Sequence, residues 1–375
     1  YMSLSQWKKA EKYQRKALEI RKLELNNSKE NGKTGNHPDA VASLNNFAEL
    51  YRSQGRYSEA ESLYIAALEI CNTELRDYHH PYTPQVLNNL ALLRCTQGRY
   101  SEAEALFIKT LTIYRAELGN SHPETAKTLA NLAVLNRLQG IYSKAEALLV
   151  EALAIYKSEL GDRHIDNAGV LSNLASLRRL QGRYSEAESL FIEVLNIYKS
   201  EMGARHPNTA IALNNLALLY DSQGRQDRAE PLYVEALSIY RATLGNYHLD
   251  TANTLNNMAG LYEIKERYSE AESLYLESIA VCKAMVGESH PDTAKGLNNL
   301  AGLYQSQGRY RKAEELLLEV TAIYKNKLGN LHPDTATSLS NLAEADRSQG
   351  RYREAESPLV EALEIRKNSL GSQHP

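Results

Sequence analysis

Apolar residues recur along this chain at intervals of three and four, the spacing that places them on one face of an α-helix. Leu213, Leu216 and Leu219 show the pattern in one segment, and Leu63 and Ala67 show it in another. No segment has the strict alternation of apolar and polar residues that a half-buried strand requires. The pattern therefore predicts an all-α protein.

The helical pattern is itself repeated. The phrase Gln-Gly-Arg-Tyr-Ser-Glu-Ala-Glu returns after 43 residues once and after 42 residues thereafter. Such fixed self-similarity is typical of a solenoid, in which each unit buries its apolar face only against its neighbours. The tyrosine position of the phrase is occupied by Tyr57, Tyr100, Tyr142, Tyr184, Gln226, Tyr268, Tyr310 and Tyr352. We predict one array over residues 1–375: a lone second helix at about 6–26, then eight repeats that start near 37, 80, 122, 164, 206, 248, 290 and 332.

Each repeat is predicted to contain two helices. The first begins at a histidine-proline phrase such as His206-Pro207, because proline is tolerated in the first helical turn. It ends at a pair such as Gln223-Gly224, where glycine permits a left-handed turn. The second helix is predicted to begin with a capping box such as Ser58-Glu59-Ala60-Glu61 and to end at pairs such as Leu118-Gly119.

The spacing inside a repeat matches a known motif. Large, small and turn residues of the tetratricopeptide motif, which spans about 34 residues, fall on Leu129, Leu132-Ala133, Gly140, Tyr142, Ala145, Leu149 and Ala152. With the phrases L-N-N-L-A, A-L-x-I-Y and L-G-x-x-H-P-D-T-A, the longer unit resembles the repeats of kinesin light chains and related bacterial repeat proteins. The resemblance covers almost the whole chain. It implies a right-handed superhelical solenoid of helix-turn-helix repeats that binds other proteins. Motor association does not carry over, because no light-chain coiled coil is present in these residues.

One position in the middle of every first helix is always asparagine, although asparagine is a mediocre helix former. In the resembling family this side-chain amide, both donor and acceptor, holds the backbone of an extended peptide in the concave groove. Alternatively the amide bonds the neighbouring repeat and sets the stacking, and the two roles can coexist. A second asparagine precedes it in most repeats, but Ala130, Ser172 and Ser340 interrupt that column. The eight predicted groove residues are Asn46, Asn89, Asn131, Asn173, Asn215, Asn257, Asn299 and Asn341.

Variable positions of the first helices would then determine specificity. Repeats three and four contribute the basic residues Lys127, Arg137 and Arg179, whereas repeats five and six contribute Asp221 and Glu263. Any one of these charges could also be an ordinary solvated side chain. Taken together, they predict a groove that is basic towards one half and acidic beyond it. Apolar residues beside the basic half, and small residues beside the acidic half, are Val134, Leu138, Leu180, Gly260 and Gly302. The partner predicted for the basic half is an acidic peptide with an apolar anchor.

Composition excludes several other classes of protein. The 43 basic and 46 acidic residues leave a net charge of −3, so no global field attracts nucleic acid or anionic membrane. No apolar run reaches the roughly 18 residues of a membrane span. Cys71, Cys95 and Cys282 are odd in number and lack metal-ligand spacing, which favours a reducing, cytoplasmic location. Cys71 and Cys282 replace tyrosines of other repeats and are predicted to be core residues. Nothing in the sequence indicates the oligomeric state.

Catalytic and metal-binding functions find no support in the spacing. Nine of the ten histidines occupy one repeat position, the turn before a first helix, about 10 Å per helix layer apart. Zinc needs ligands at about 2 Å, so we predict that these histidines cap helices. The turn arginines, spread one per repeat, are predicted to be solvated. No phosphate-binding loop, nucleophile elbow or H-E-x-x-H motif is present.

The sequence therefore predicts a non-catalytic protein-interaction scaffold, without a cofactor or metal, that binds an extended peptide or partner segment in its concave groove. The alternative is a regulatory or sensor array of a larger signalling ATPase or protease, whose effector domain would lie outside these residues.

Overall fold

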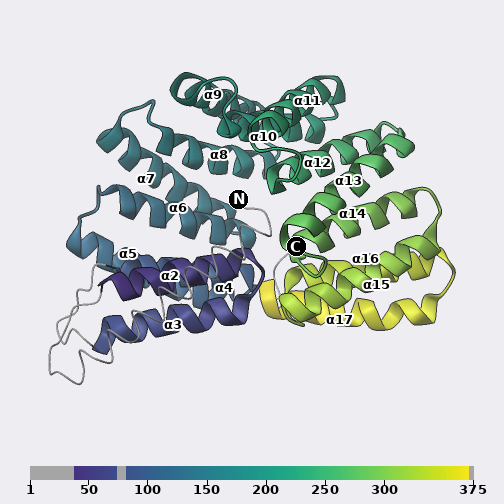
Figure 1. Cartoon of the computed structure of the whole chain (residues 1–375), viewed down its shortest axis with the longest axis horizontal. Helices are drawn as coiled ribbons and strands as arrows, with labels where there is room; N and C mark the ends of the chain where they lie inside the picture. Colours follow the sequence, from purple (N-terminus) through teal and green to yellow (C-terminus); the bar gives the residue numbers. More distant parts are fainter. Residues whose placement is uncertain (1–37, 74–81, 371–375) are drawn as a thin grey trace. The chain divides into compact units, whose positions relative to one another are not determined.

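The computed structural model describes residues 38–73 and 82–370, and every regular element in these ranges is an α-helix. The predicted all-α class is confirmed. The predicted lone helix at about 6–26 lies outside the described residues. First and second helices alternate along the chain (Figure 1). The first helices are α2 (Pro38–Ser53), α4 (Thr83–Thr96), α6 (Pro123–Leu138), α8 (Ile165–Leu180), α10 (Pro207–Ser222), α12 (Leu249–Ile264), α14 (Pro291–Ser306) and α16 (Pro333–Ser348). The second helices are α3 (Tyr57–Thr73), α5 (Tyr100–Glu117), α7 (Tyr142–Leu160), α9 (Tyr184–Met202), α11 (Gln226–Thr243), α13 (Tyr268–Val286), α15 (Tyr310–Lys327) and α17 (Tyr352–Leu370).

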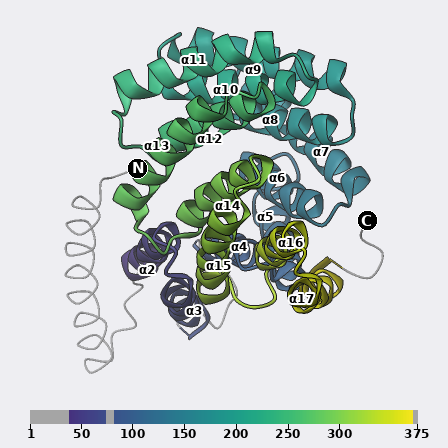
Figure 2. The same cartoon turned by 90° about the vertical axis from the view of Figure 1, so that its right-hand side faces the viewer.

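The chain forms two compact units, residues 2–131 and residues 132–375, which are divided within α6. In the second unit the first helices α10, α12, α14 and α16 contact one another in sequence, and each second helix packs against the first helix that follows. Helices α9, α11 and α13 lie on the outer side of this curved stack, and α8, α10 and α12 lie on its inner side (Figure 2). The first helices therefore form the concave layer of this unit.

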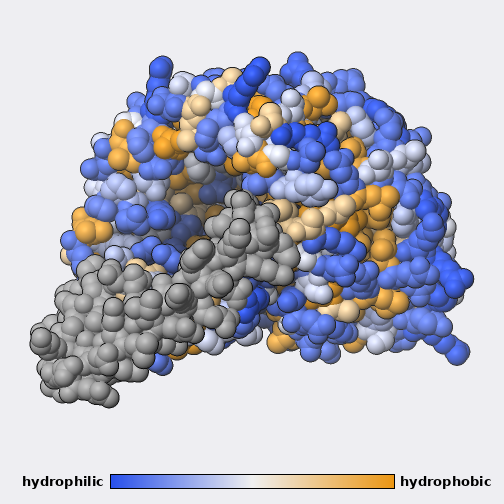
Figure 3. All heavy atoms as spheres, viewed as in Figure 1, coloured by the Kyte–Doolittle hydropathy of each residue, from blue (hydrophilic) through white to orange (hydrophobic). Residues whose placement is uncertain are grey.

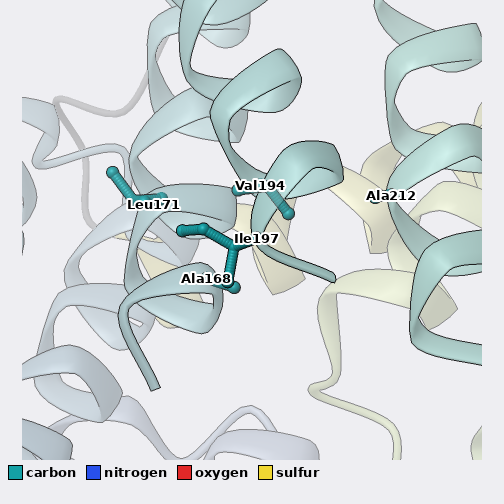
Figure 4. Packing of buried hydrophobic residues seen from close by; sticks show 5 residues of the cluster. All are labelled: Ala168, Leu171, Val194, Ile197 and Ala212. Carbon is teal, nitrogen blue, oxygen red and sulfur yellow. The ribbon is translucent and has the colours of Figure 1, made fainter. Parts of the chain in front are cut away.

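Large and small apolar residues interlock between the helices of successive repeats. Val194 and Ile197 of α9 pack against Ala168 and Leu171 of α8 and against Ala212 of the following α10 (Figure 4). The first-helix alanines of the repeated motif are fully buried, because only a small side chain lets two helices approach closely. They are Ala48, Ala91, Ala133, Ala175, Ala217, Ala259, Ala301 and Ala343.

Two of the three cysteines belong to this core, as predicted. Cys71 and Cys282 are buried, and Cys282 packs with Leu249 and Met285. Burial raises the pKa of the Cys282 thiol to about 12. Since the thiolate is the reactive form of cysteine, this side chain serves packing.

The prediction that the repeat histidines cap first helices is confirmed for the six that lie within the described residues, whereas α4 begins after Tyr82, which forms no side-chain cap bond. In each case Nδ1 accepts a hydrogen bond from the backbone N–H two residues later, at 3.0 to 3.3 Å. This bond satisfies one of the backbone donors that a helix leaves free at its N-terminus. The capping residues are His122, His164, His206, His248, His290 and His332.

The capping box predicted for the second helices is wrong. These helices begin at the tyrosine position of the phrase, which is Gln226 in α11, one residue earlier than the predicted serine cap. The N-cap residue of α5 is Arg99, with no side-chain cap bond. Ala103 N already donates to Arg99 O at 3.1 Å, which places Ser101 inside the first turn where it cannot cap. Instead the Arg99 guanidinium donates from Nε to Glu102 Oε1 at 2.7 Å, so an ion pair closes the turn.

Glycine ends most helices with a positive φ, as the turn phrases predict. Gly224 after α10 has a φ of 70° and Gly119 after α5 has a φ of 91°. The sixth repeat departs from this rule, because Glu266 occupies the glycine position with a φ of 58°. It is the one positive-φ residue other than glycine in the described ranges. An L-residue pays a steric cost in this conformation that glycine avoids.

The surface carries both hydrophilic and apolar side chains. On the face in Figure 3, apolar residues are scattered among hydrophilic ones. In the described ranges, none of the helices combines the length and the apolar character that crossing a bilayer requires.

Candidate functional site

The repeated asparagines form hydrogen bonds between first helices. In the second unit, Asn299 Nδ2 donates to Asn256 Oδ1 at 2.9 Å, and Asn341 Nδ2 donates to Asn298 Oδ1 at 3.0 Å. The same bond joins Asn257 to Asn214 in this unit, and in the first unit it joins Asn89 to Asn45 and Asn131 to Asn88. The stacking role is thus present wherever both columns carry asparagine. Each amide keeps a second N–H, so a ligand role for these residues stays a prediction.

Three of the eight asparagines have no such bond: Asn46, whose preceding repeat lies outside the described residues, and Asn173 and Asn215. Asn173 and Asn215 are half-buried, and none of the hydrogen bonds within the described ranges involves either side-chain amide. The column that supplies the acceptor holds Ala130 and Ser172 in the repeats before them. The asparagine ladder is therefore interrupted in the middle of the array, and there the amides keep all their hydrogen-bonding capacity.

Two of the predicted basic residues, on α6 and α8, influence each other electrostatically. Burial and the like charge of Arg179 lower the pKa of Arg137, and Arg137 Nε is buried without a hydrogen-bond partner. Arg179 Nη1 donates to Ser222 Oγ of the next repeat at 3.1 Å. Neither guanidinium forms an ion pair with any described carboxylate. Two neighbouring cations without a counter-ion form a site suited to an anionic group.

Asp221, next to Ser222, brings the opposite charge to the same region. Its Oδ1 is buried without a hydrogen-bond partner, and burial raises the pKa of the carboxyl. Burial and the Asp221 charge raise the pKa of Tyr233, while Arg179 acts in the opposite direction. Both charged groups therefore lie close to this ring, whose hydroxyl is also buried and unpartnered. Asp221 is the acidic counterpart of the arginine pair, one repeat away from Arg179.

Glu263, predicted to extend the acidic half, is engaged within the protein. Its Oε1 accepts from Ser306 Oγ at 2.8 Å and its Oε2 accepts from Tyr275 Oη at 3.3 Å. A Cβ atom at Gly260 would lie 3.5 Å from the Tyr275 hydroxyl, so the small residue leaves only ordinary contact distance beside that ring. Glu263 thus has less free capacity for a ligand than Asp221.

Lys127 does not join the arginine pair. Its Nζ lies 3.4 Å from Glu124 Oε2, one turn earlier on α6. Ten residues separate Lys127 from Arg137, which is about 15 Å along a helix. Leu138 and Leu180, the neighbours of the two arginines, are 39% and 43% exposed. An exposed leucine thus follows each arginine of the pair, as the predicted apolar anchor site requires.

The prediction that the turn arginines are merely solvated is wrong. Arg225 Nη1 donates to Glu188 Oε2 of the preceding second helix at 2.8 Å, and Tyr220 Oη donates to Glu188 Oε1 at 2.8 Å. The same arrangement recurs with Arg309, Glu272 and Tyr304, where the bond from Arg309 holds the pKa of Glu272 below its ordinary value. The fixed separation of 37 residues between this glutamate and arginine was the signal in the sequence. These arginine–glutamate and tyrosine–glutamate hydrogen bonds connect successive repeats.

Metal ligation has no geometric basis in the described ranges, where no three His, Cys, Asp or Glu side chains are grouped to hold an ion. A depression of about 560 Å³ is lined by Ile192, Glu193 and Asn196 of α9, with Asp162 and Arg163. None of the predicted groove residues lines it.

A stack of helix pairs with polar and charged side chains on its inner layer defines a helical-repeat interaction scaffold. The tetratricopeptide repeat family matches the chain in seven segments that together cover most of it, so this protein belongs to that family. The matched segments are residues 1–73, 39–116, 82–158, 166–242, 227–284, 250–326 and 292–368.

The chain is also similar to several solved structures. BtubC (BKLC) from P. vanneervenii is 26% identical with a TM-score of 0.50, over 63% of this chain and 94% of that one. A putative kinesin light chain repeat protein from Podosopora anserina is also 26% identical, over 56% of this chain and 99% of that one, with a TM-score of 0.46. The apo quorum sensor NprR from B. thuringiensis shares the fold, with a TM-score of 0.58, 18% identity and coverage of 96% and 97%. None of the curated proteins compared with the chain matches it.

Proposed function

We propose that this array is a non-catalytic scaffold that captures an extended peptide segment of a protein partner on its first-helix layer. The observation that supports the proposal is the pair of guanidinium groups of Arg137 and Arg179, on first helices α6 and α8, which form no ion pair with a described carboxylate. A site that holds two like charges near each other without a counter-ion gains from binding an anion. Side-chain amides on the same helices can hold peptide backbone irrespective of sequence.

The favoured ligand has an acidic side chain beside a bulky apolar one. The acidic group would pair with the arginines, and the apolar side chain would cover the exposed Leu138 and Leu180. Burial of one such side chain contributes roughly 1.5–3 kcal/mol. The charged contacts would supply specificity and salt dependence.

The test is selection of peptides from a random display library on the purified protein, followed by mapping with a photo-crosslinking residue. The crosslinker replaces Ile211 or Ile264 on first helices, and Val234 or Leu276 on second helices, all of which are exposed. We expect crosslinks only from the first-helix positions. Enriched peptides that crosslink from Val234 or Leu276 would contradict the proposal.

Charge reversal provides the second arm of the test. The double variant Arg137→Glu, Arg179→Glu should lower the affinity for acidic peptides at least about tenfold. It should also reduce the salt sensitivity of binding, because the charge-assisted contacts are lost. The matched control is Arg311→Glu, since Arg311 is 90% exposed on second helix α15. Circular dichroism must show the same helix content in all three proteins.

A further inference from the structure

We propose that the peptide-binding segment of this groove is the interruption of the asparagine ladder, and that it selects an extended peptide carrying one acidic and one basic side chain. This inference rests on the proposed function and specifies its ligand. The residues concerned are Ser172, Asn173, Arg179, Asn215 and Asp221, all in the second unit.

The first step concerns the amides. Asn257, Asn299 and Asn341 each donate one side-chain N–H to an asparagine of the preceding repeat. Ser172 cannot supply the corresponding amide oxygen to Asn215, and the side-chain amide of Asn215 forms no hydrogen bond with a described residue. A peptide that crosses α8 and α10 therefore finds amides whose donors and acceptor are all available. Where the ladder is intact, the same peptide would contact amides that already form a hydrogen bond with a neighbouring repeat.

The second step concerns two charges, each six residues after one of these amides and so about 9 Å further along the same helix. Arg179 lies on α8 near Arg137, and Asp221 lies one repeat later on α10 with a buried and unpartnered Oδ1. No ion pair joins Arg179 to Asp221 among the described side chains, although both act on the ring of Tyr233. Each charge can therefore take a partner of opposite sign from a ligand. The site is bipolar, because the acidic end demands a cation that a purely acidic peptide lacks.

The third step fixes the spacing in the ligand. The hydrogen bond from Arg179 to Ser222 joins α8 to α10, and neighbouring packed helices lie about 8–10 Å apart. An extended chain advances about 3.3 Å per residue. The acidic and basic side chains of the ligand should therefore be about three positions apart.

The probes are fluorescein-labelled peptides of glycine and serine that carry one Glu, an adjacent Leu, and one Lys three positions from the Glu. A second peptide carries the two charges in exchanged order, and control peptides carry two Glu or two Lys. We expect one of the mixed-charge orders to bind at least about tenfold more tightly than the like-charge peptides in fluorescence anisotropy. The variant Arg179→Asp with Asp221→Arg should prefer the opposite order.

The variant Ser172→Asn tests the role of the interruption. It restores the missing acceptor beside Asn215 and should weaken binding several-fold while leaving the urea midpoint equal or higher. Ser185→Asn is the matched control, since it makes the identical change at an exposed serine of second helix α9, and it should leave both peptide affinity and the urea midpoint unchanged. A Ser172→Asn protein with undiminished affinity would overturn the inference.

The outcomes separate this inference from the proposed function. Peptides that bind the first helices with no preference for mixed charge, or with a preference unchanged in the swapped variant, leave the proposed function standing and overturn the bipolar site. If no probe or selected peptide binds the first-helix layer, both fail.

Discussion

Asn299 Nδ2 lies 2.9 Å from Asn256 Oδ1, so an asparagine of one first helix is held by an asparagine of the repeat before it. Both side chains are half-buried, and the bond crosses between α12 and α14. Because array stability depends on the contacts between neighbouring repeats, a bond of this kind acts at the interface that matters most.

Removal of the acceptor should therefore destabilise the array. We expect Asn256→Ala to lower the free energy of unfolding by roughly 0.5–1.5 kcal/mol, the net worth of a typical hydrogen bond. Urea denaturation followed by circular dichroism measures the change. The control is Asn215→Ala, which removes an amide that has no described partner and should cost less than about 0.5 kcal/mol. Equal losses in the two variants would show that the ladder bonds do not stabilise the stack.

The second prediction concerns the turn between α12 and α13. Glu266 has a φ of 58°, at a position where the other described repeats have glycine. The variant Glu266→Gly should raise the free energy of unfolding by about 0.5–1 kcal/mol, because relief of steric strain exceeds the added entropy of the unfolded chain. The reverse change in a neighbouring repeat, Gly308→Glu, should be destabilising, since Gly308 has a φ of 72°. A thermal melt that shows Glu266→Gly to be the less stable protein would contradict this account.

Periodicity was sufficient to predict the fold. It placed the helices, the positive-φ glycines and the histidine caps, because each of these depends on residues close together in the chain. The capping box failed for a local reason: the tyrosine before Ser101 already belongs to the helix, so the first turn starts at Arg99. A motif that fits a sequence pattern can be displaced by one residue when a charged pair closes the turn equally well.

The site was harder to predict, because its decisive features join residues more than 30 positions apart. The bond from Arg225 to Glu188 was missed, although both residues belong to the repeated phrase. The sequence groups Lys127 with the arginines because all three occupy variable positions of first helices. Lys127 and Arg137 are ten residues apart on one helix, which separates them by about 15 Å. The side-chain amide of Asn215 lacks a partner because position 172 holds serine instead of asparagine. This substitution could be interpreted only after the structure had shown that the two asparagine columns form hydrogen bonds with each other.

The third prediction tests the packing of the small residues. Ala217 is fully buried between helices, whereas Ala242 on α11 is exposed. We expect Ala217→Leu to cost roughly 1–3 kcal/mol, because added methylenes force neighbouring side chains out of their rotamers. The identical change Ala242→Leu should lie within about 0.5 kcal/mol of the parent. Chemical denaturation distinguishes them, and similar losses at both sites would rule out the assignment of Ala217 to a helix contact.

The last prediction concerns acid stability. Burial lowers the pKa of His248 and of His290, against the opposing effects of Asp250 and Asp292, and Lys327 lowers that of His290 further. In both residues Nδ1 accepts a backbone hydrogen bond, which requires that nitrogen to be unprotonated. The unfolded chain, with an ordinary histidine pKa near 6.5, binds more protons than the folded chain in mildly acidic solution. Acid therefore favours unfolding, so this contribution is complete above pH 6.5 and is lost as the pH falls through the folded pKa values. The urea midpoint should drop between pH 7.5 and pH 5.5. Replacement of both histidines by asparagine, which caps helices without titrating, should reduce that drop. If the double variant loses as much stability as the parent over this range, the acid sensitivity resides in other groups and the caps are not titrated.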